Sequence, residues 1–314
     1  MNLEDLLPPP LRGLDTKITP IAAGLSGAGV YRVEAAGQSF VLKTVAPIES
    51  AEEWRRAVDI QRLAAAAGLA PRIVHVDLSH RAVLTEFIVD RSFLAFYFDP
   101  RSHEAALTEL GRTVRRIHAL PTAGLPVRDA RQLFRKVFDE FLVDFAVPSF
   151  AAAAISRVLA EEPPPPEGPP VLCHNDPNPS NIVYDGQRIL MLDWAVAAPM
   201  DAYFDLGVLG VFLRMDGKTA RGLLSAYAER PIDALPDGFQ YHRRLAATMA
   251  GAFGLYLARK LNHPGASGTE TVENTLSLVE FYQQLRGGAL KLGTPDGQWA
   301  FGLALIKEGL ELPT

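Results

Sequence analysis

The segment from Val171 to Leu213 constrains this chain more than any other, because it places polar side chains at fixed points beside short apolar runs. Asp176 is followed five residues later by Asn181, and two prolines between them prevent a helix, so both lie on a loop. Asp193 ends a short apolar run that predicts a strand. A carboxylate, a carboxamide and a second carboxylate in this order can orient a hydroxyl and hold metal ions on a triphosphate, as phosphoryl transfer requires.

Composition limits the class of protein. The 314 residues are 48% hydrophobic and 21% charged, which is typical of a globular protein. The net charge of −5 gives no basic surface for nucleic acid. No apolar run reaches the roughly 18 residues of a membrane span, and the acidic N-terminus does not resemble a signal peptide. We therefore expect a cytoplasmic protein with no membrane partner. Cys173 is the only cysteine, and its apolar neighbours favour a small buried residue.

The first part of the chain reads as a sheet with one helix. Three short strands are predicted within residues 18–45, a helix over 50–67 that ends at Gly68, and two further strands at Arg72–Val76 and Ala82–Ile88. Together they predict a five-stranded antiparallel sheet. The apolar face of the helix is predicted to comprise Trp54, Ala57, Ile60, Leu63 and Ala64.

After residue 88 the pattern changes to long helices. These are predicted at 104–119, 128–145, 149–160, 199–214, 217–229, 238–261 and 268–286, interrupted only by two short strands that flank Asp185-Gly186. The proline-rich tract at 161–170 reads as an extended surface loop. The fold class is therefore α+β, with an N-terminal nucleotide-binding lobe at 1–88 and a larger, mostly helical C-terminal lobe at 89–314.

The glycine-rich sequence GLSGAG at 24–29 lies between two predicted strands. It is either an ordinary hairpin turn or a hairpin over phosphates, with Ser26 and Gly27 offering backbone N–H groups. Lys43, near the end of the third strand, is either a solvated strand residue or a cation that reaches the α- and β-phosphates. Agreement with the later loop favours the functional reading of both.

The residue types in the catalytic segment indicate a chemical role for each polar side chain. Asp176 can take the proton of an attacking hydroxyl, while Asn181 and Asp193 supply hard oxygen ligands suited to Mg²⁺. The alternative for each acid is a turn or helix cap. His174 is interpreted as a structural residue, because no second His or Cys lies at metal-ligand spacing. The sequence Gly217-Lys218-Thr219 is not a P-loop, because the glycine that the motif needs five positions earlier is Phe212.

Five motifs resemble the aminoglycoside phosphotransferase and choline kinase family. They are GLSGAGVYRV, VLK at 41–43, LTEFI at 84–88, CHNDPNPSN at 173–181 and LDW at 192–194. The sequence of the catalytic loop most resembles that of choline and ethanolamine kinases. The resemblance implies a protein-kinase-like fold, ATP and Mg²⁺ as cofactors, and a small hydroxyl-bearing substrate. It implies Asp176 as catalytic base, Asn181 and Asp193 as metal ligands and Lys43 on the phosphates. It also implies adenine on the backbone of the two residues Glu86 and Ile88, and Asp205 as a brace for the catalytic loop.

Two positions depart from that pattern. Arg56 stands where the family usually has the helix glutamate that pairs with the strand lysine, and either Glu52 or Glu53 could replace it. Ala195 stands where choline kinases typically have glutamate. We expect an ATP-dependent kinase of a small metabolite, choline/ethanolamine-like or aminoglycoside-like. The alternative is an inactive pseudokinase that binds nucleotide or acts as a scaffold. A protein substrate is disfavoured, because only a short link follows Asp193 before Pro199.

The acceptor is not identified by the sequence. A quaternary ammonium would require aromatic faces, and an aminoglycoside would favour an excess of acidic residues, which residues 201–314 do not have. The aromatic candidates are Trp194, Tyr203, Phe204, Tyr241, Phe253, Tyr256, Tyr282 and Trp299.

Overall fold

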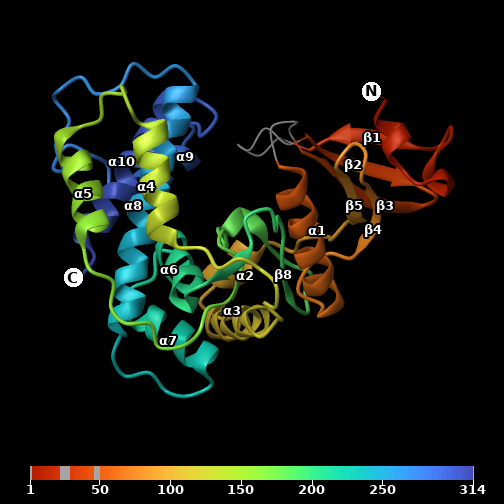
Figure 1. The fold of residues 1–314 in the computed structure, drawn as a ribbon, viewed down its shortest axis with the longest axis horizontal. Coiled ribbons are helices and arrows are strands. Elements are labelled where there is room, and N and C mark those ends of the chain that lie inside the picture. The colour runs from red at the N-terminus through yellow and green to blue at the C-terminus, as the bar shows by residue number, and fades with distance from the viewer. Residues whose placement is uncertain (1, 22–28, 46–49, 314) are drawn as a thin grey trace. The chain divides into compact units, whose positions relative to one another are not determined.

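The computed structural model describes residues 2–21, 29–45 and 50–313 (Figure 1). These residues form two compact units, each assembled from separate stretches of the chain. Unit 1 comprises Met1–Pro121, Asp176–Ala197 and Ser225–Arg230, and unit 2 comprises Thr122–Asn175, Ala198–Leu224 and Pro231–Thr314. No helix in the described part of the chain is long and apolar enough to cross a lipid bilayer.

Unit 1 is built around a five-stranded antiparallel sheet with the strand order β1-β2-β3-β5-β4. Its strands are β1 (Lys17–Pro20), β2 (Gly29–Ala35), β3 (Gln38–Thr44), β4 (Ile73–Asp77) and β5 (Ala82–Glu86). Ala36 and Gly37 join β2 to β3 with positive φ angles of 50° and 71°, which suit the tight turn of a hairpin. The predicted sheet is confirmed.

Helix α1 (Ala51–Ala66) begins at Ser50, whose hydroxyl accepts the Glu53 N–H at 3.4 Å, and is followed by Gly68 with a φ of +72°. Trp54 and Val58 of this helix pack with Val83 of the sheet. The prediction that Leu63 belongs to the buried face is wrong, because its side chain is 41% exposed. Nine residues after Trp54, a helix has turned to the opposite side, so Leu63 faces away from the sheet.

The rest of unit 1 includes the helices α2 (Phe93–Phe98) and α3 (His103–His118) and the hairpin of β7 (Ile182–Tyr184) and β8 (Ile189–Met191). Asp185 and Gly186 turn this hairpin as predicted: Gly186 has a φ of +99°, and the Asp185 carboxylate accepts the Gln187 and Arg188 N–H groups at 2.9 Å. The Met191 N–H donates to the Leu69 carbonyl at 2.8 Å, which ties β8 to the segment after α1.

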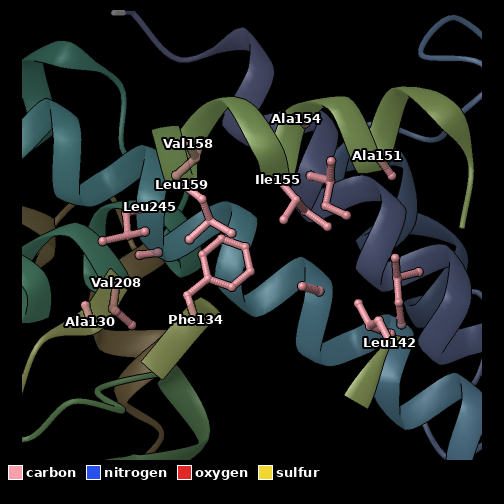
Figure 2. Packing of buried hydrophobic residues seen from close by; sticks show 14 of the residues in the cluster. Ala130, Phe134, Leu142, Ala151, Ala154, Ile155, Val158, Leu159, Val208 and Leu245 are labelled. Atoms are coloured by element: carbon pink, nitrogen blue, oxygen red, sulfur yellow. The ribbon is translucent and has the colours of Figure 1, made fainter. Parts of the chain in front are cut away.

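Unit 2 is mostly helical and has one large apolar core. The core combines residues of several helices, and Figure 2 shows Phe134, Leu159, Val208 and Leu245 among them. The elements of unit 2 are α4 (Ala130–Phe141), α5 (Ser149–Ala160), β6 (Val171–Cys173), β9 (Ala198–Met200), α6 (Ala202–Phe212), α7 (Gly217–Ala228, which ends in unit 1), α8 (Asp237–Lys260), α9 (Leu278–Arg286) and α10 (Pro295–Glu311).

Three predictions for the helical part are corrected. The helix expected to begin at 199 begins at Ala202, because Ala198–Met200 instead pairs with β6. The helix expected from 268 begins only at Leu278, where Ser277 and Glu280 form a capping box. Helix α10 was not predicted, although Thr294 and Pro295 form a recognisable helix start. Its three glycines obscured the helical pattern.

Helices α8 and α10 cross at a contact made possible by glycine. A Cβ atom added at Gly251 would lie 2.6 Å from the Ile306 Cγ1 atom and 2.7 Å from the Gly302 carbonyl oxygen. One added at Gly302 would lie 2.8 Å from the Gly251 carbonyl oxygen. Because real Cβ atoms cannot approach so closely, the two backbones can pack at this distance only without side chains.

We expect the substitution Gly251→Ala to lower the free energy of unfolding by about 1–3 kcal/mol, because the added methyl group overpacks this crossing. The matched control is Gly217→Ala, whose Cβ would meet only the flexible Arg221 side chain at 3.5 Å. The control should leave stability unchanged or slightly raise it. Urea unfolding followed by circular dichroism measures both, and equal stability of the two variants would contradict this account of the crossing.

Candidate active site

A buried carboxylate holds the start of the catalytic loop. Asp205 of α6 is 1% exposed, and its two oxygens accept the backbone N–H groups of His174 and Asn175, each at 2.7 Å. Asn175 has a φ of +65°, so the chain leaves its extended path just after β6. A buried carboxylate needs such hydrogen bonds to offset lost hydration. Asp205 therefore has the bracing contacts that the resemblance implied.

The neighbours of this loop start are structural. His174 is fully buried, as its interpretation as a structural residue requires. Cys173 is also fully buried, and its Sγ lies 3.5 Å from the Asp201 carbonyl oxygen. Burial, with the nearby Asp205 and Asp201 carboxylates, raises the pKa of the Cys173 thiol well above its ordinary value. The thiol is thus an unreactive core group.

Asp176, the predicted base, is half-buried and held by two carboxamides. The Asn181 Nδ2 donates to Asp176 Oδ2 and to the Asp176 carbonyl, both at 2.9 Å, and the Asn178 Nδ2 donates to Asp176 Oδ1 at 2.8 Å. Each carboxylate oxygen therefore has a donor that fixes its direction. The Asn181 carboxamide oxygen remains the atom that suits a hard cation.

Asn178 is a site residue that the sequence reasoning missed. Its side chain bridges the Asp176 carboxylate and Ser180, whose N–H donates to Asn178 Oδ1 at 2.9 Å. The available signal was an asparagine directly before a proline, since this residue caps the short 3₁₀ turn Pro179–Asn181.

Lys43 and Asp193 form an ion pair across 150 residues of chain. The Lys43 Nζ lies 2.6 Å from Asp193 Oδ1, and the two side chains are 29% and 35% exposed. The Leu192 N–H donates to the Asn181 carbonyl at 2.8 Å, which fixes the residue before Asp193 beside the catalytic loop. Lys43, Asp176, Asn181 and Asp193 thus all belong to unit 1.

These donors fit a divalent metal ion. Asp193 already neutralises a cation, the Lys43 ammonium group, at 2.6 Å. A carboxylate and a carboxamide are oxygen ligands of the hard kind that Mg²⁺ prefers. Asp193 also has a φ of +57°, uncommon for a residue with a side chain, and the Ala195 N–H donates to its Oδ1 at 3.4 Å.

Glu52 does not take the place of the missing helix glutamate as the partner of Lys43. Glu52 pairs with Arg56 one turn along α1, at 3.0 Å. The ion-pair partner of Lys43 is Asp193. Arg56 is therefore engaged within its own helix, and Lys43 is oriented by the Asp193 carboxylate.

The residues expected near adenine lie at and after the end of β5. The Glu86 N–H donates to the Arg72 carbonyl at 3.0 Å, and the Glu86 side chain accepts the Arg72 N–H at 2.9 Å. Ser26 and Gly27 lie outside the described residues.

The five-stranded sheet and the mostly helical remainder define a protein-kinase-like fold. The model of the phosphotransferase enzyme family (APH) matches residues 17–246, and the chain belongs to this family. A search of curated protein sequences found no match.

Solved structures share the fold at low sequence identity. A choline/ethanolamine kinase family protein from Mesorhizobium loti is 19% identical with a TM-score of 0.60, covering 93% of this chain and 92% of its own. A macrolide 2'-phosphotransferase from Brachybacterium faecium is 22% identical with a TM-score of 0.56, covering 78% and 88%. Spectinomycin phosphotransferase in complex with ADP and spectinomycin is 15% identical with a TM-score of 0.55, covering 92% and 93%. The predicted fold and family are confirmed.

We expect Asp205→Asn to lower the free energy of unfolding by about 1–3 kcal/mol, because an amide keeps one acceptor oxygen and turns an NH₂ group toward the second backbone N–H. Hydrogen exchange at the His174 and Asn175 amides should accelerate. Asp233→Asn, at an exposed loop position of the same unit, is the control. Unchanged exchange at both amides would show that the carboxylate does not brace the loop.

Proposed function

We propose that this protein is an ATP-dependent small-molecule kinase that transfers the γ-phosphate of ATP to a hydroxyl of a small metabolite. The observation that carries the proposal is the pairing of Asp176 with Asn181 and of Lys43 with Asp193 within one compact unit. These are the base, the metal ligands and the phosphate-binding cation that such a transfer needs. The ADP in the spectinomycin phosphotransferase structure supports a nucleotide as the phosphate donor.

Asp176 would act on the acceptor. Its carboxylate, held by Asn178 and Asn181, receives a hydrogen bond from the acceptor hydroxyl and orients the oxygen toward the γ-phosphorus. As the new O–P bond forms, the bond from the γ-phosphorus to the β,γ-bridging oxygen breaks and its electrons stay on ADP. The hydroxyl proton passes to Asp176.

The nucleotide would be held by groups on several elements of residues 1–88. Lys43 would leave its contact with Asp193 to meet the α- and β-phosphates, Ser26 and Gly27 would offer backbone N–H groups, and adenine would meet the backbone of Glu86 and Ile88. Mg²⁺ held by Asn181 and Asp193 would neutralise phosphate charge. The acceptor would bind within residues 89–314, and the use of ATP is consistent with a cytoplasmic enzyme.

The placement of aromatic rings bears on the acceptor. Four of the eight candidate aromatics, Trp194, Phe204, Tyr241 and Trp299, are at most 8% exposed and belong to the interior. Lys260 lies over the Tyr256 ring at 5.2 Å and Arg214 over the Tyr282 ring at 5.5 Å, so these faces already carry a cation. Six of the eight candidates, all but Tyr203 and Phe253, are thus buried or already carry a cation, which supports an amino alcohol or hydroxylated metabolite held by polar groups over a quaternary ammonium held in an aromatic cage.

The second candidate is an inactive pseudokinase, favoured by Arg56 at the position of the helix glutamate. The ordered contacts of Asp176 oppose it, because a module that only binds nucleotide has no need for a base held by two carboxamides. Turnover distinguishes the two candidates.

We expect Asp176→Asn to lower kcat about 10³-fold, because the carboxamide cannot accept the hydroxyl proton. ADP release in the presence of Mg²⁺ measures this. ATP binding, followed by isothermal titration calorimetry, should stay within about threefold of the parent, since Asp176 acts on the acceptor. Asp15→Asn, an exposed aspartate of unit 1, is the control. Retained turnover in Asp176→Asn would refute the proposed base.

We expect a panel of acceptors to release ADP selectively. The panel includes ethanolamine, choline, an aminoglycoside, a macrolide, homoserine and simple sugars, and ethanolamine should be turned over at least about tenfold faster than choline, because the structure favours polar contacts over an aromatic cage. A choline preference would overturn the inference about the aromatics. Measurable ATP binding with no turnover of any acceptor would favour the pseudokinase.

A further inference from the structure

A groove separates the second half of α1 from strand β4 in unit 1. The cavity has a volume of about 520 Å³ and is lined by Arg62, Ala65 and Ala66 of the helix and by residues 72–76. The two alanines are the smallest side chains that a helix face can present, and they leave room beside the strand. Nothing in the proposed phosphoryl transfer uses this groove.

Strand β4 is at the edge of the sheet, and among the described strands it pairs only with β5. The Glu86 N–H donates to the Arg72 carbonyl. Because backbone groups alternate in direction along a strand, Glu86, Leu84 and Ala82 of β5 direct their N–H and C=O groups toward β4. His75 and Asp77 lie opposite such residues. Val76, between them, therefore directs its N–H and C=O toward the open edge. An open edge of this kind is a template for another extended chain.

The groove carries two exposed arginines. Arg62 and Arg72 expose 53% and 66% of their side chains. Arg62 pairs with the exposed Asp59 at 2.8 Å, and Arg72 lies 3.7 Å from the partly buried Glu86 carboxylate; both contacts are weak enough to exchange for another carboxylate.

We propose that this groove binds an extended, acidic peptide segment of a partner protein, which adds to β4 as a sixth strand. The open backbone groups of β4 select an extended chain, and alternate side chains of that chain point into the groove and away from it. Arg62 and Arg72 select acidic side chains, because opposite charges favour encounter and fix the register of an added strand.

The same contacts would couple the peptide to α1. Trp54 and Val58 of this helix pack with Val83, and Ile73 and Val76 of β4 pack against that cluster. A strand added at β4 would therefore press on the residues that seat α1 on the sheet. The same helix carries Arg56, at the position where the family usually has the glutamate that pairs with the strand lysine. The partner would therefore act on that helix.

The test is a selection of random short peptides displayed on phage against the full-length protein, followed by affinity measurement on synthetic versions of the enriched sequences. The enriched peptides should be acidic and free of proline, and they should slow hydrogen exchange at the Val76 amide. Val76→Pro removes the outward N–H without touching the ladder to β5 and should weaken binding at least about tenfold.

A double substitution, Arg62→Glu with Arg72→Glu, should weaken the same peptides to a similar extent. Arg55→Glu makes the same type of substitution two turns before Arg62 on α1, at an exposed position outside the groove, with half the charge change of the double variant, and should leave affinity unchanged. Circular dichroism shows that each variant is folded. Enriched peptides without acidic bias, or affinities equal in all variants, would overturn the proposal. Dimerisation of the protein that Val76→Pro abolishes would assign the edge to a second copy of the chain and overturn it as well.

Discussion

The catalytic loop depends on one buried carboxylate. Asp205 accepts the backbone N–H groups of His174 and Asn175, and these groups could not be satisfied by a strand, because Asn175 has left the extended conformation. A charged group is costly in the protein interior unless its hydrogen bonds are met, and here two short N–H bonds meet them. Asp176 follows directly in the chain, so Asp205 fixes the backbone immediately before the proposed base, while Asn178 and Asn181 hold the carboxylate of Asp176 itself.

The ion pair of Lys43 with Asp193 solves a second problem. The family position that would hold the lysine carries Arg56, and that arginine is engaged by Glu52 in its own helix. A partly buried ammonium group needs a counter-charge, and the Asp193 carboxylate supplies it at 2.6 Å. In the proposed mechanism the same carboxylate would exchange the ammonium group for a metal ion, so nucleotide binding and metal binding would both depend on the position of the Asp193 side chain.

Local chemistry explains how much could be predicted from the sequence. The sheet, α1 and the β7–β8 hairpin follow from alternating apolar residues and turn residues such as Gly37 and Gly186, and these are local signals. Pairing of β9 with β6 joins residues far apart in sequence, and three residues carry too little periodicity to show it. Helix α10 was missed because it contains three glycines, which reduce helix propensity, although two of them, Gly302 and Gly309, allow close packing against α8. Packing overrode propensity in that case.

The same limit applies to the site. Residue type and spacing were enough to identify Asp176, Asn181 and Asp193 as candidates, because phosphoryl transfer needs particular side chains in a particular order. The support from Asn178 was not, since it arises from the path of the loop between two prolines. Glu52 and Glu53 were equal candidates in sequence; in the structure Glu52 pairs with Arg56 one turn along the same helix, and Lys43 pairs with Asp193.

The interleaving of the two units has a consequence for biosynthesis. The carbonyl of Leu69 receives its hydrogen bond from Met191, and Lys43 receives its counter-charge from Asp193, both more than 100 residues later in the chain. As the ribosome releases the chain in order, the sheet is complete long before these partners exist. These two contacts within unit 1 can therefore form only after the segment Thr122–Asn175 of unit 2 has been translated.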